Sequence, residues 1–354
     1  MPLKKIRIKA AASQAAPNGA GIRLDQFLAQ TLPAQLGRPI SKGKVRKLIV
    51  AGAVYLNRTR VRIASKEIKP GAQLEVLIDL QRLDSDGPAR DIPFEMSAQS
   101  ILFEDEFIIA VDKPAGLPTQ PTLDEARNNL FAAVKRFLAD RQKVPVGQVY
   151  LALHHRLDRD TSGVIVFSKS EKANPGLAKV FASREAQKTY HALASLNAKG
   201  QRTHTGAERR PEGGSGKWPG KWSVQNYLGR AAGKNQYCSV RAGGDPAHTD
   251  FRVLEEFHNA FGPKTYWIEA RPHTGRTHQI RVHLSESGLP ILGDSTYGGV
   301  SQIGKIRIPR MMLHAVSLTF PHPIHQNEIA IHSGVPGDFN QCLKALQKGP
   351  SEDT

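Results

Sequence analysis

The polar stretch His155–Gly163, followed directly by the apolar run Val164–Phe167, constrains the fold of this chain more than any other segment. The β-branched and aromatic run predicts a buried strand. The glycine that closes the loop tolerates a positive φ or a close approach of another backbone. Asp158 lies between Arg156 and Arg159, whose guanidinium groups would hold a carboxylate ionised and oriented. Such a carboxylate suits a nucleophile better than a general acid. A structural ion-pair corner is the alternative.

The charge of the chain is strongly positive and unevenly distributed. The 354 residues include 49 Lys and Arg against 32 Asp and Glu, a net charge of +17. Residues 1–80 hold 15 basic and four acidic residues, a net charge of +11. This bias indicates an anionic partner, with nucleic acid bound by the first part and chemistry carried out by the rest. A merely soluble basic surface is the alternative.

The basic N-terminal part reads as a flexible arm followed by a small α/β domain. We predict a basic arm over residues 1–21, a helix from Arg23 to Pro33, and a second helix from an N-cap at Ser41 to Gly52. Short strands are expected at 54–56 and 74–78. One face of the second helix and the loop after residue 56 carry the basic side chains, which are Lys42, Lys44, Arg46, Lys47, Arg58, Arg60 and Arg62.

Residues 22–80 resemble the S4 RNA-binding domain in this order of two small helices, a strand, a basic loop and the strand Gly71–Ile78. The resemblance implies contacts to RNA phosphates, which supply affinity that is independent of sequence and sensitive to salt. We expect these contacts from Lys42, Lys44, Arg46, Lys47, Arg58 and Arg60. A solvated amphipathic helix is the alternative.

Beyond a polar linker at 81–97, the chain alternates predicted strands and helices. Strands are expected at 101–103, 107–111, 187–196, 249–254, 265–270 and 312–320, and helices at 129–140, 173–183 and 276–284. We expect an insert of irregular structure at 197–246. After about residue 337 we expect a C-terminal tail (338–354) that is part helix and part disorder.

Four ordered stretches resemble the RluA branch of the pseudouridine synthases. They are Val111–Leu117, His155–Gly163, Lys188–Ala192 and Arg271–His283. The resemblance covers roughly residues 100–335. It implies an α+β protein in which the S4-like domain precedes a catalytic domain (98–337) built on a mixed, mainly antiparallel β-sheet with flanking helices.

The resemblance also implies roles for individual residues. Asp158 matches the covalent nucleophile, and Tyr190 matches a tyrosine that packs on the base and assists removal of the C5 proton. Arg281 matches an arginine that pairs with the nucleophile, and Arg156 matches one that takes the place of the extruded base. The chain departs from the family at 118–121, where Pro-Thr-Gln-Pro stands in place of an expected histidine.

The insert carries Trp218 and Trp222 among lysines, glycines and prolines. Such tryptophans could stack on RNA bases while the lysines contact phosphates. Equally, the insert could be a β-hairpin whose tryptophans pack against the parent domain.

Composition and spacing indicate neither a metal nor a cofactor. Cys238 and Cys342 form no pair typical of a disulfide framework or a zinc site. The histidines, including His278 and His283, match no metal-ligand spacing. No apolar run approaches the ~20 residues of a membrane span, and no signal peptide is apparent. We therefore expect a cytoplasmic monomer without an obligate protein partner.

We expect an RNA-modifying enzyme whose substrate is structured RNA, with large-subunit ribosomal RNA favoured over transfer RNA. A non-catalytic RNA-binding or ribosome-assembly factor is the alternative from another class. A hydrolase that releases uracil would require a water-activating base, which the sequence does not offer.

Overall fold

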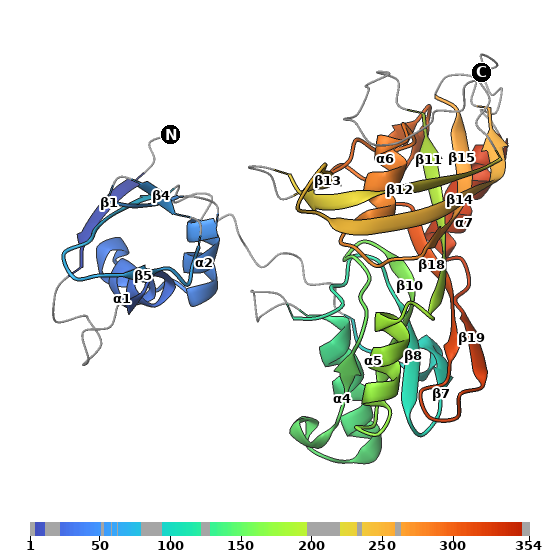
Figure 1. Cartoon of the computed structure of the whole chain (residues 1–354), viewed down its shortest axis with the longest axis horizontal. Coiled ribbons are helices and arrows are strands. Elements are labelled where there is room, and N and C mark those ends of the chain that lie inside the picture. The colour runs from blue at the N-terminus through green and yellow to red at the C-terminus, as the bar shows by residue number, and fades with distance from the viewer. Residues whose placement is uncertain are drawn as a thin grey trace. The chain divides into compact units, whose positions relative to one another are not determined.

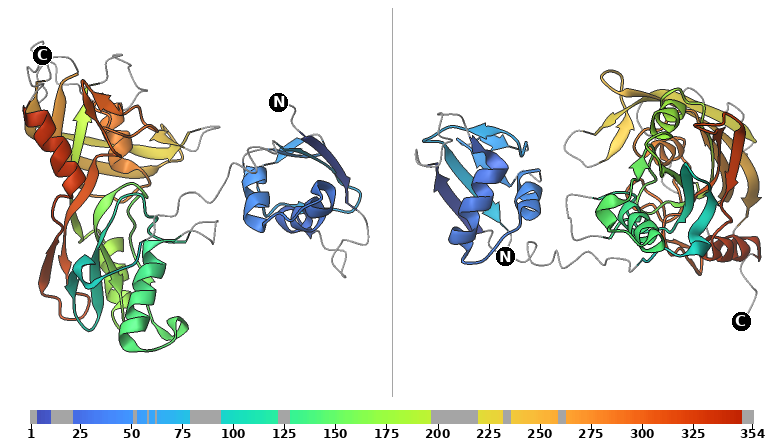
Figure 2. Two further views of the ribbon diagram at one scale, coloured as in Figure 1. Left: turned by 180° about the vertical axis from the view of Figure 1, so that it is seen from behind. Right: turned by 90° about the horizontal axis from the view of Figure 1, so that it is seen from below.

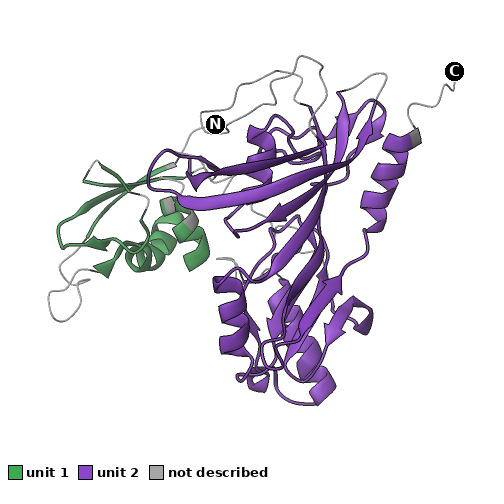
Figure 3. Cartoon of the chain, turned by 45° about the vertical axis from the view of Figure 1, so that its right-hand side comes forward, with its two compact units in different colours: residues 1–91, 122–127 green, residues 92–121, 128–354 purple. Residues whose placement is uncertain are grey.

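The computed structural model describes residues 4–10, 22–50, 53–57, 59–61, 63–78, 94–121, 128–196, 220–231, 236–258 and 263–348. The chain divides into two compact units, residues 1–91 with 122–127 and residues 92–121 with 128–354 (Figure 3). Most of the predicted linker lies outside the described residues. No helix among the described residues is long and apolar enough to cross a membrane.

The first unit packs two helices against a four-stranded antiparallel sheet (Figure 1). Its helices are α1 (Leu24–Leu36) and α2 (Lys42–Val50). The sheet has the order β1-β6-β3-β4, and a separate pair joins β2 to β5. Their bounds are β1 (Lys4–Lys9), β2 (Ile22–Arg23), β3 (Val54–Leu56), β4 (Thr59–Val61), β5 (Glu67–Ile68) and β6 (Gln73–Ile78). Ser41 caps α2 as predicted, since its Oγ accepts the Lys44 N–H at 3.2 Å.

The prediction that the first helix ends at Pro33 was wrong. Helix α1 continues to Leu36 and stops at Gly37, which has a φ of 69° and donates its N–H to the carbonyl of Pro33. Proline already has a helical φ and costs mainly one hydrogen bond and some crowding. The buried apolar face of α1 offsets that cost, and the left-handed glycine ends the helix.

The prediction of a flexible arm over residues 1–21 was wrong for residues 4–9. They form strand β1, which pairs antiparallel with β6 from Lys4↔Ile78 to Lys9↔Gln73. The basic residues alternate with Ile6, which is buried, and Ile8, which packs against the core. This period-two pattern is that of a half-buried edge strand. On the other face, Lys5 Nζ lies 2.6 Å from Glu75 Oε1.

The second unit is built on an eleven-stranded sheet of order β13-β12-β14-β15-β11-β18-β10-β8-β7, with β19 paired to β18 and β9 to β10. The β10–β18 pair is parallel and the other pairs are antiparallel. This arrangement confirms the predicted α+β fold with a mixed, mainly antiparallel sheet. The strands are β7 (Ile101–Glu104), β8 (Ile108–Lys113), β9 (Ala152–Leu153), β10 (Ser162–Ser168), β11 (Gln187–Ser195), β12 (Lys221–Arg230), β13 (Tyr237–Ser239), β14 (Asp245–Phe257), β15 (Thr265–Pro272), β18 (Leu313–Pro321) and β19 (Glu328–His332).

Helices cover both faces of the β7–β10 end of this sheet. Alternate residues of β10 enter two cores: Ile165 and Phe167 pack with α4 (Leu130–Gln142), whereas Val164 and Val166 pack with α5 (Asn174–Ala182). A strand with two buried faces has no polar alternation, which explains the continuous apolar run. Figure 1 shows both helices at this end.

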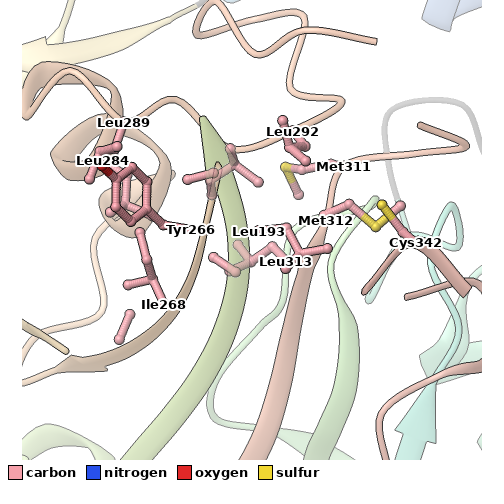
Figure 4. Packing of buried hydrophobic residues seen from close by; sticks show 14 of the residues in the cluster. Leu193, Tyr266, Ile268, Leu284, Leu289, Leu292, Met311, Met312, Leu313 and Cys342 are labelled. Atoms are coloured by element: carbon pink, nitrogen blue, oxygen red, sulfur yellow. The ribbon is translucent and has the colours of Figure 1, made fainter. Parts of the chain in front are cut away.

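The β11–β15 end forms a further core with helices α6 (Gln279–Glu286) and α7 (Gly337–Lys348). Figure 4 shows the cluster, in which Tyr266 and Ile268 of β15 lie near Leu284 of α6. Seen from behind, the red helix α7 lies against this end (Figure 2). Phe339 and Leu346 of α7 are buried in the same core. The helix expected after residue 337 is therefore confirmed, but it is not a tail, because α7 packs into the core.

Two further expectations need correction in this half of the chain. The predicted irregular insert contains strands β12 and β13 in its described part, and Trp222 stacks on Phe251 of β14 with ring centroids 5.0 Å apart. Trp222 therefore packs against the parent domain, as the second of the two expectations for the insert had it. Trp218 lies outside the described residues. The helix predicted from Arg276 starts only at Gln279, because His278 has a left-handed φ of 58°.

Gly163 lies in the parallel pair of strands, β10 and β18, at the centre of the sheet. It pairs with Ala315 of β18 and has a φ of 114°. A Cβ atom at this position would lie 2.1 Å from the Ala315 carbonyl oxygen, a distance that no side chain tolerates. Glycine is therefore required here, and it sets the direction of the loop that carries Asp158.

Candidate active site

One cavity of about 570 Å³ gathers the residues that the sequence singled out. Its walls come from the loop ahead of β10, from β11, and from the turn between β15 and α6. Asp158, Tyr190, Arg281 and Arg156 all line it. These residues are up to 125 positions apart in the chain, so the tertiary structure brings the predicted set together.

Asp158 is held from across the cavity and not by its sequence neighbours. Arg281 donates from Nη1 to Oδ2 of Asp158 at 3.0 Å. Arg156 instead donates to Thr277 Oγ1 at 2.6 Å, and Arg159 donates from Nε to the Gly116 carbonyl at 2.9 Å. The expectation that Arg156 and Arg159 hold the carboxylate was therefore wrong, because the loop directs their side chains elsewhere.

Arg281 is shared between two carboxylates. Besides Asp158, it donates from Nε and Nη2 to the two oxygens of Asp294, at 2.7 and 2.9 Å. Burial disfavours its charge most strongly, but hydrogen bonds and attraction from Asp294 and then Asp158 outweigh burial and raise its pKa above the usual range. The bidentate pair to Asp294 fixes the guanidinium, so that only Nη1 reaches the loop.

Asp158 keeps one oxygen available. Among the described residues, Arg281 and His278 both approach Oδ2 of the carboxylate, and Oδ1 accepts no hydrogen bond. The side chain is 23% exposed, toward the cavity. A charged carboxylate with one anchored and one open oxygen is suited to nucleophilic attack.

Tyr190 lies on β11 where the pairing with β18 shifts register between Thr189 and Tyr190. A bulge of this kind turns a side chain out of the regular alternation. Burial, and then the negative charge of Asp158, raise the pKa of Tyr190. The phenol is therefore neutral across the physiological range, with a flat apolar face and a hydroxyl that can donate or accept a proton.

Two buried groups fix the loop that carries Asp158. Lys113, fully buried at the end of β8, donates from Nζ to the carbonyls of Pro114, Leu117 and Arg159 at 2.9, 2.7 and 2.9 Å. Thr119 donates from Oγ1 to the Leu157 carbonyl at 2.8 Å. The segment that departs from the family pattern therefore contacts the loop directly.

The cavity wall carries several basic side chains besides Arg281. Arg184, Lys188 and Arg276 line it together with Arg156. Burial lowers the pKa of Lys188, whose ammonium lies over the Phe181 ring at 5.3 Å. Lys188 has no acidic partner among the described residues, so this wall offers an uncompensated positive charge to an anionic ligand.

The basic residues predicted on the first unit differ in availability. Lys42 is exposed and Lys44 half-buried. Arg46 donates from Nε to Asp25 Oδ2 at 2.8 Å, and Arg60 donates to the Tyr55 hydroxyl from Nε at 3.0 Å. Arg58 and the side chain of Lys47 lie outside the described part of the chain. Sequence reasoning missed Asp25, which is buried between Arg23 and Arg46.

Sequence reasoning also missed three residues of the cavity region, namely Asp294, His278 and Lys188. Lys188 and His278 lie within stretches that carry the family resemblance but were given no role there, and Asp294 was given none either. The roles of Asp294 and His278 depend on Arg281 and Asp158, which are distant in the chain.

Three potential metal ligands meet at the edge of the cavity. His273 Nε2 lies 2.6 Å and His248 Nε2 3.3 Å from the carboxylate of Asp250. The two imidazoles stack with centroids 4.2 Å apart and planes 18° apart. A metal ion lies in the plane of each ring that binds it, and stacked, nearly parallel planes cannot share one ion. Hydrogen bonds to Asp250 and Ser223 account for this arrangement.

Comparisons with known proteins agree with this geometry. A family model described as RNA pseudouridylate synthase matches residues 107–286, and an S4 domain model matches residues 22–74. The ribosomal large subunit pseudouridine synthase D of Nitrosomonas europaea is 31% identical over 339 residues, which cover 94% of this chain and 87% of that protein. The protein of the same name from Vibrio parahaemolyticus is 30% identical over 342 residues, covering 94% and 93%.

A solved structure shows the same fold. The human RNA pseudouridylate synthase domain containing 4 protein covers 70% of this chain and 93% of its own, with a TM-score of 0.50 and 23% identity.

Proposed function

This chain belongs to the RNA pseudouridylate synthase family, and from that premise we propose that it isomerises uridine in large-subunit ribosomal RNA with Asp158 as the covalent nucleophile. The observation that carries the role of Asp158 is its environment. Arg281 anchors Oδ2 at 3.0 Å, while Oδ1 faces a cavity of about 570 Å³ without a hydrogen-bond partner among the described residues.

The reaction breaks the N1–C1′ bond of uridine, turns the uracil and rejoins it through C5. Asp158 adds covalently, at the sugar or at the base, and is released when the new bond forms. Arg281 anchors the carboxylate through Oδ2, and Asp294 keeps Arg281 in place. The residues that line the cavity need to hold the detached uracil only long enough for it to turn.

Tyr190 supports the later steps. Its ring lies in the cavity beside Asp158 and offers a flat surface for the uracil. Its raised pKa keeps the hydroxyl protonated, so it relays the C5 proton through its hydroxyl and does not act as a standing phenolate.

Arg156 and Lys188 complete the proposed substrate contacts. Arg156 is exposed at the cavity mouth, where its guanidinium takes the place of the extruded base. Lys188 lies two residues before Tyr190 on β11, and its uncompensated charge binds a phosphate of the target strand.

The choice of ribosomal RNA rests on the relatives and on the first unit. The named bacterial relatives are large-subunit ribosomal enzymes and align with nearly the whole chain. The S4 domain adds exposed cationic side chains such as Lys42, which contact phosphates of a large folded RNA. One copy suffices, because Asp158, Tyr190 and Arg281 all come from this chain. Transfer RNA is the competing substrate.

The test is tritium release from RNA transcripts that contain 5-tritiated uridine, with ribosomal and transfer RNA assayed side by side. We expect release from ribosomal RNA by the native chain and none by Asp158→Asn, which should still bind RNA. Asp160→Asn is the matched control, because Asp160 is exposed two residues away and does not line the cavity.

Release by Asp158→Asn at the native rate would refute the nucleophile. Release from transfer RNA alone would show that transfer RNA, and not ribosomal RNA, is the substrate. Tight binding without release from any RNA would favour the non-catalytic RNA-binding factor.

A further inference from the structure

His278 stands at the start of α6 with its imidazole turned toward the nucleophile. Its left-handed backbone, with a φ of 58°, departs from the helix that follows. The ring Nε2 lies 3.8 Å from Oδ2 of Asp158, the same oxygen that Arg281 binds. A non-glycine residue in this conformation is strained, and such strain persists where the surrounding contacts hold it.

The other ring nitrogen of His278 meets the hydroxyl of Tyr297. Nδ1 and the Tyr297 oxygen are 2.8 Å apart. The same oxygen accepts the backbone N–H of Tyr237 at 2.9 Å. Within the described chain, Nδ1 is the acceptor within reach of the hydroxyl proton. The tyrosine therefore donates to Nδ1, which leaves the proton of a neutral imidazole on Nε2.

We propose that His278 is a positioning residue whose Nε2–H tautomer is fixed by Tyr297 and strand β13, and that it directs this N–H toward Oδ2 of Asp158. This inference rests on the proposed role of Asp158 as the nucleophile. With Arg281 and His278 both addressing Oδ2, the attacking oxygen is Oδ1. The histidine thus acts through Asp158, by selecting which oxygen reacts.

Burial of His278 favours the neutral ring. Burial is the largest influence and lowers its pKa; Arg281 and Arg156 act in the same direction, while Asp158 and Asp294 oppose them. Tyr237 and Tyr297 pack edge-on against the ring at 5.8 and 5.6 Å. A protonated ring would instead form an ion pair with Asp158 and draw charge from the nucleophile.

Strand β13 supplies the backbone donor to Tyr297, which is the N–H of Tyr237. This hydrogen bond leaves the Tyr297 hydroxyl to donate its own proton to His278. It lies beside α6 (Figure 1), and Glu286 of α6 accepts hydrogen bonds from the N–H and the hydroxyl of Ser239 at 2.8 and 3.0 Å. Gln236, just before the strand, donates to the Thr296 carbonyl at 3.0 Å. An edge strand within the predicted insert is thereby connected to the nucleophile through Tyr297 and His278.

Nitrogen NMR of the full chain tests the tautomer directly. With ¹⁵N-labelled histidine, the signals of His278 are assigned by their loss in His278→Gln. We expect a pyrrole-type Nε2 and a pyridine-type Nδ1 at neutral pH. A proton on Nδ1, or on both nitrogens, would overturn the proposal.

Tyr297→Phe tests the role of the tautomer in the reaction. Loss of the donor to Nδ1 removes support for the neutral ring, so the pKa of His278 rises and the acid limb of the kcat–pH profile moves to higher pH. On the acid side of the profile, we expect kcat to fall on the order of tenfold relative to the native chain at the same pH, with KM unchanged. A loss of this size is expected for a small misplacement of reacting groups.

Tyr266→Phe is the matched control. Tyr266 is fully buried in the core, and its hydroxyl has no hydrogen-bond partner among the described residues. Its pH profile should match that of the native chain. An unshifted profile and an unchanged tautomer in Tyr297→Phe would refute the inference. The NMR result does not depend on turnover, so it separates failure of this inference from failure of the proposed function.

Discussion

Asp25 in the first unit and Asp158 in the second are both carboxylates held by arginines, yet their environments differ. Asp25 accepts from Arg23 through both oxygens, at 3.1 and 3.0 Å, and from Arg46 at 2.8 Å. Its side chain is 5% exposed. Among the described residues, Asp158 accepts a hydrogen bond only from Arg281, at Oδ2, and its side chain is 23% exposed toward a cavity.

The difference separates a structural carboxylate from the proposed nucleophile. Hydrogen bonds from Arg23 contribute most to lowering the pKa of Asp25 to about 2, against opposing burial and with further help from Arg46. Both oxygens of Asp25 accept hydrogen bonds from arginines, so neither is available for another partner and the carboxylate has a structural role. At Asp158 one oxygen is anchored and one is open. The open oxygen of Asp158, more than the presence of arginine, is what distinguishes the proposed nucleophile from Asp25.

The largest expected effect comes from removing the anchor of the reactive carboxylate. Arg281→Gln leaves Oδ2 of Asp158 unheld and Asp294 without its bidentate partner. We expect kcat to fall on the order of 10²- to 10³-fold, as for the loss of a preorganised charged donor. Stability should fall by about 3–5 kcal/mol, because Asp294 remains a buried, unpaired charge. Tritium release and chemical denaturation measure the two effects.

Arg310→Gln is the control for that change. Arg310 forms a similar bidentate pair with Asp338, at 2.6 and 3.0 Å, and does not line the cavity. It should lower stability while leaving kcat near the native value at temperatures where the chain is folded. Equal losses of kcat in the two variants would show that Arg281 acts only through the fold.

Removal of residues 1–91 separates the two units and should have an intermediate effect. Because the catalytic cavity stays complete, we expect release from a short uridine-containing RNA to persist. The affinity for large ribosomal fragments should fall, and the slope of log affinity against log salt should shrink by about 0.7–0.9 for each lost phosphate contact. Binding measured between low and moderate salt provides this slope. An unchanged slope would contradict the proposed RNA contacts of the S4 domain.

The smallest expected effect concerns the structural carboxylate. Asp25→Asn should leave kcat unchanged and lower the stability of the first unit by about 1–2 kcal/mol at neutral pH. The folded pKa of Asp25, about 2, lies below the ordinary value of 3.8. Its stabilisation is therefore present above about pH 4 and is lost as the pH falls toward 2.

Hydrogen exchange of the α1 amides at pH 7 and pH 3 in the native chain and in Asp25→Asn measures this difference. The two proteins should converge as the pH falls. Equal protection at pH 7 would mean that Asp25 contributes nothing to the first unit.

Much of the fold could be read from local patterns. The apolar run Val164–Phe167 predicted the buried strand β10, and Ser41 predicted the start of α2. Pattern reading failed where a weak pattern depended on a distant partner. Strand β1 exists because β6, about 70 residues away, completes its hydrogen bonds. Helix α7 belongs to the core because its apolar residues share one cluster with residues of β11 and β15.

The sequence by itself determined the family, the loop that carries Asp158 and the glycine that the central strands require. Residue type and short spacing encode these features, because backbone conformation and strand burial are local properties. The tertiary structure decided which charges meet. Asp158 and Arg281 are 123 residues apart, and the arginines adjacent to Asp158 turn away. The roles of Asp294, His278 and Tyr297 likewise depend on side-chain directions at the junction of several strands and a helix, which spacing along the chain does not fix.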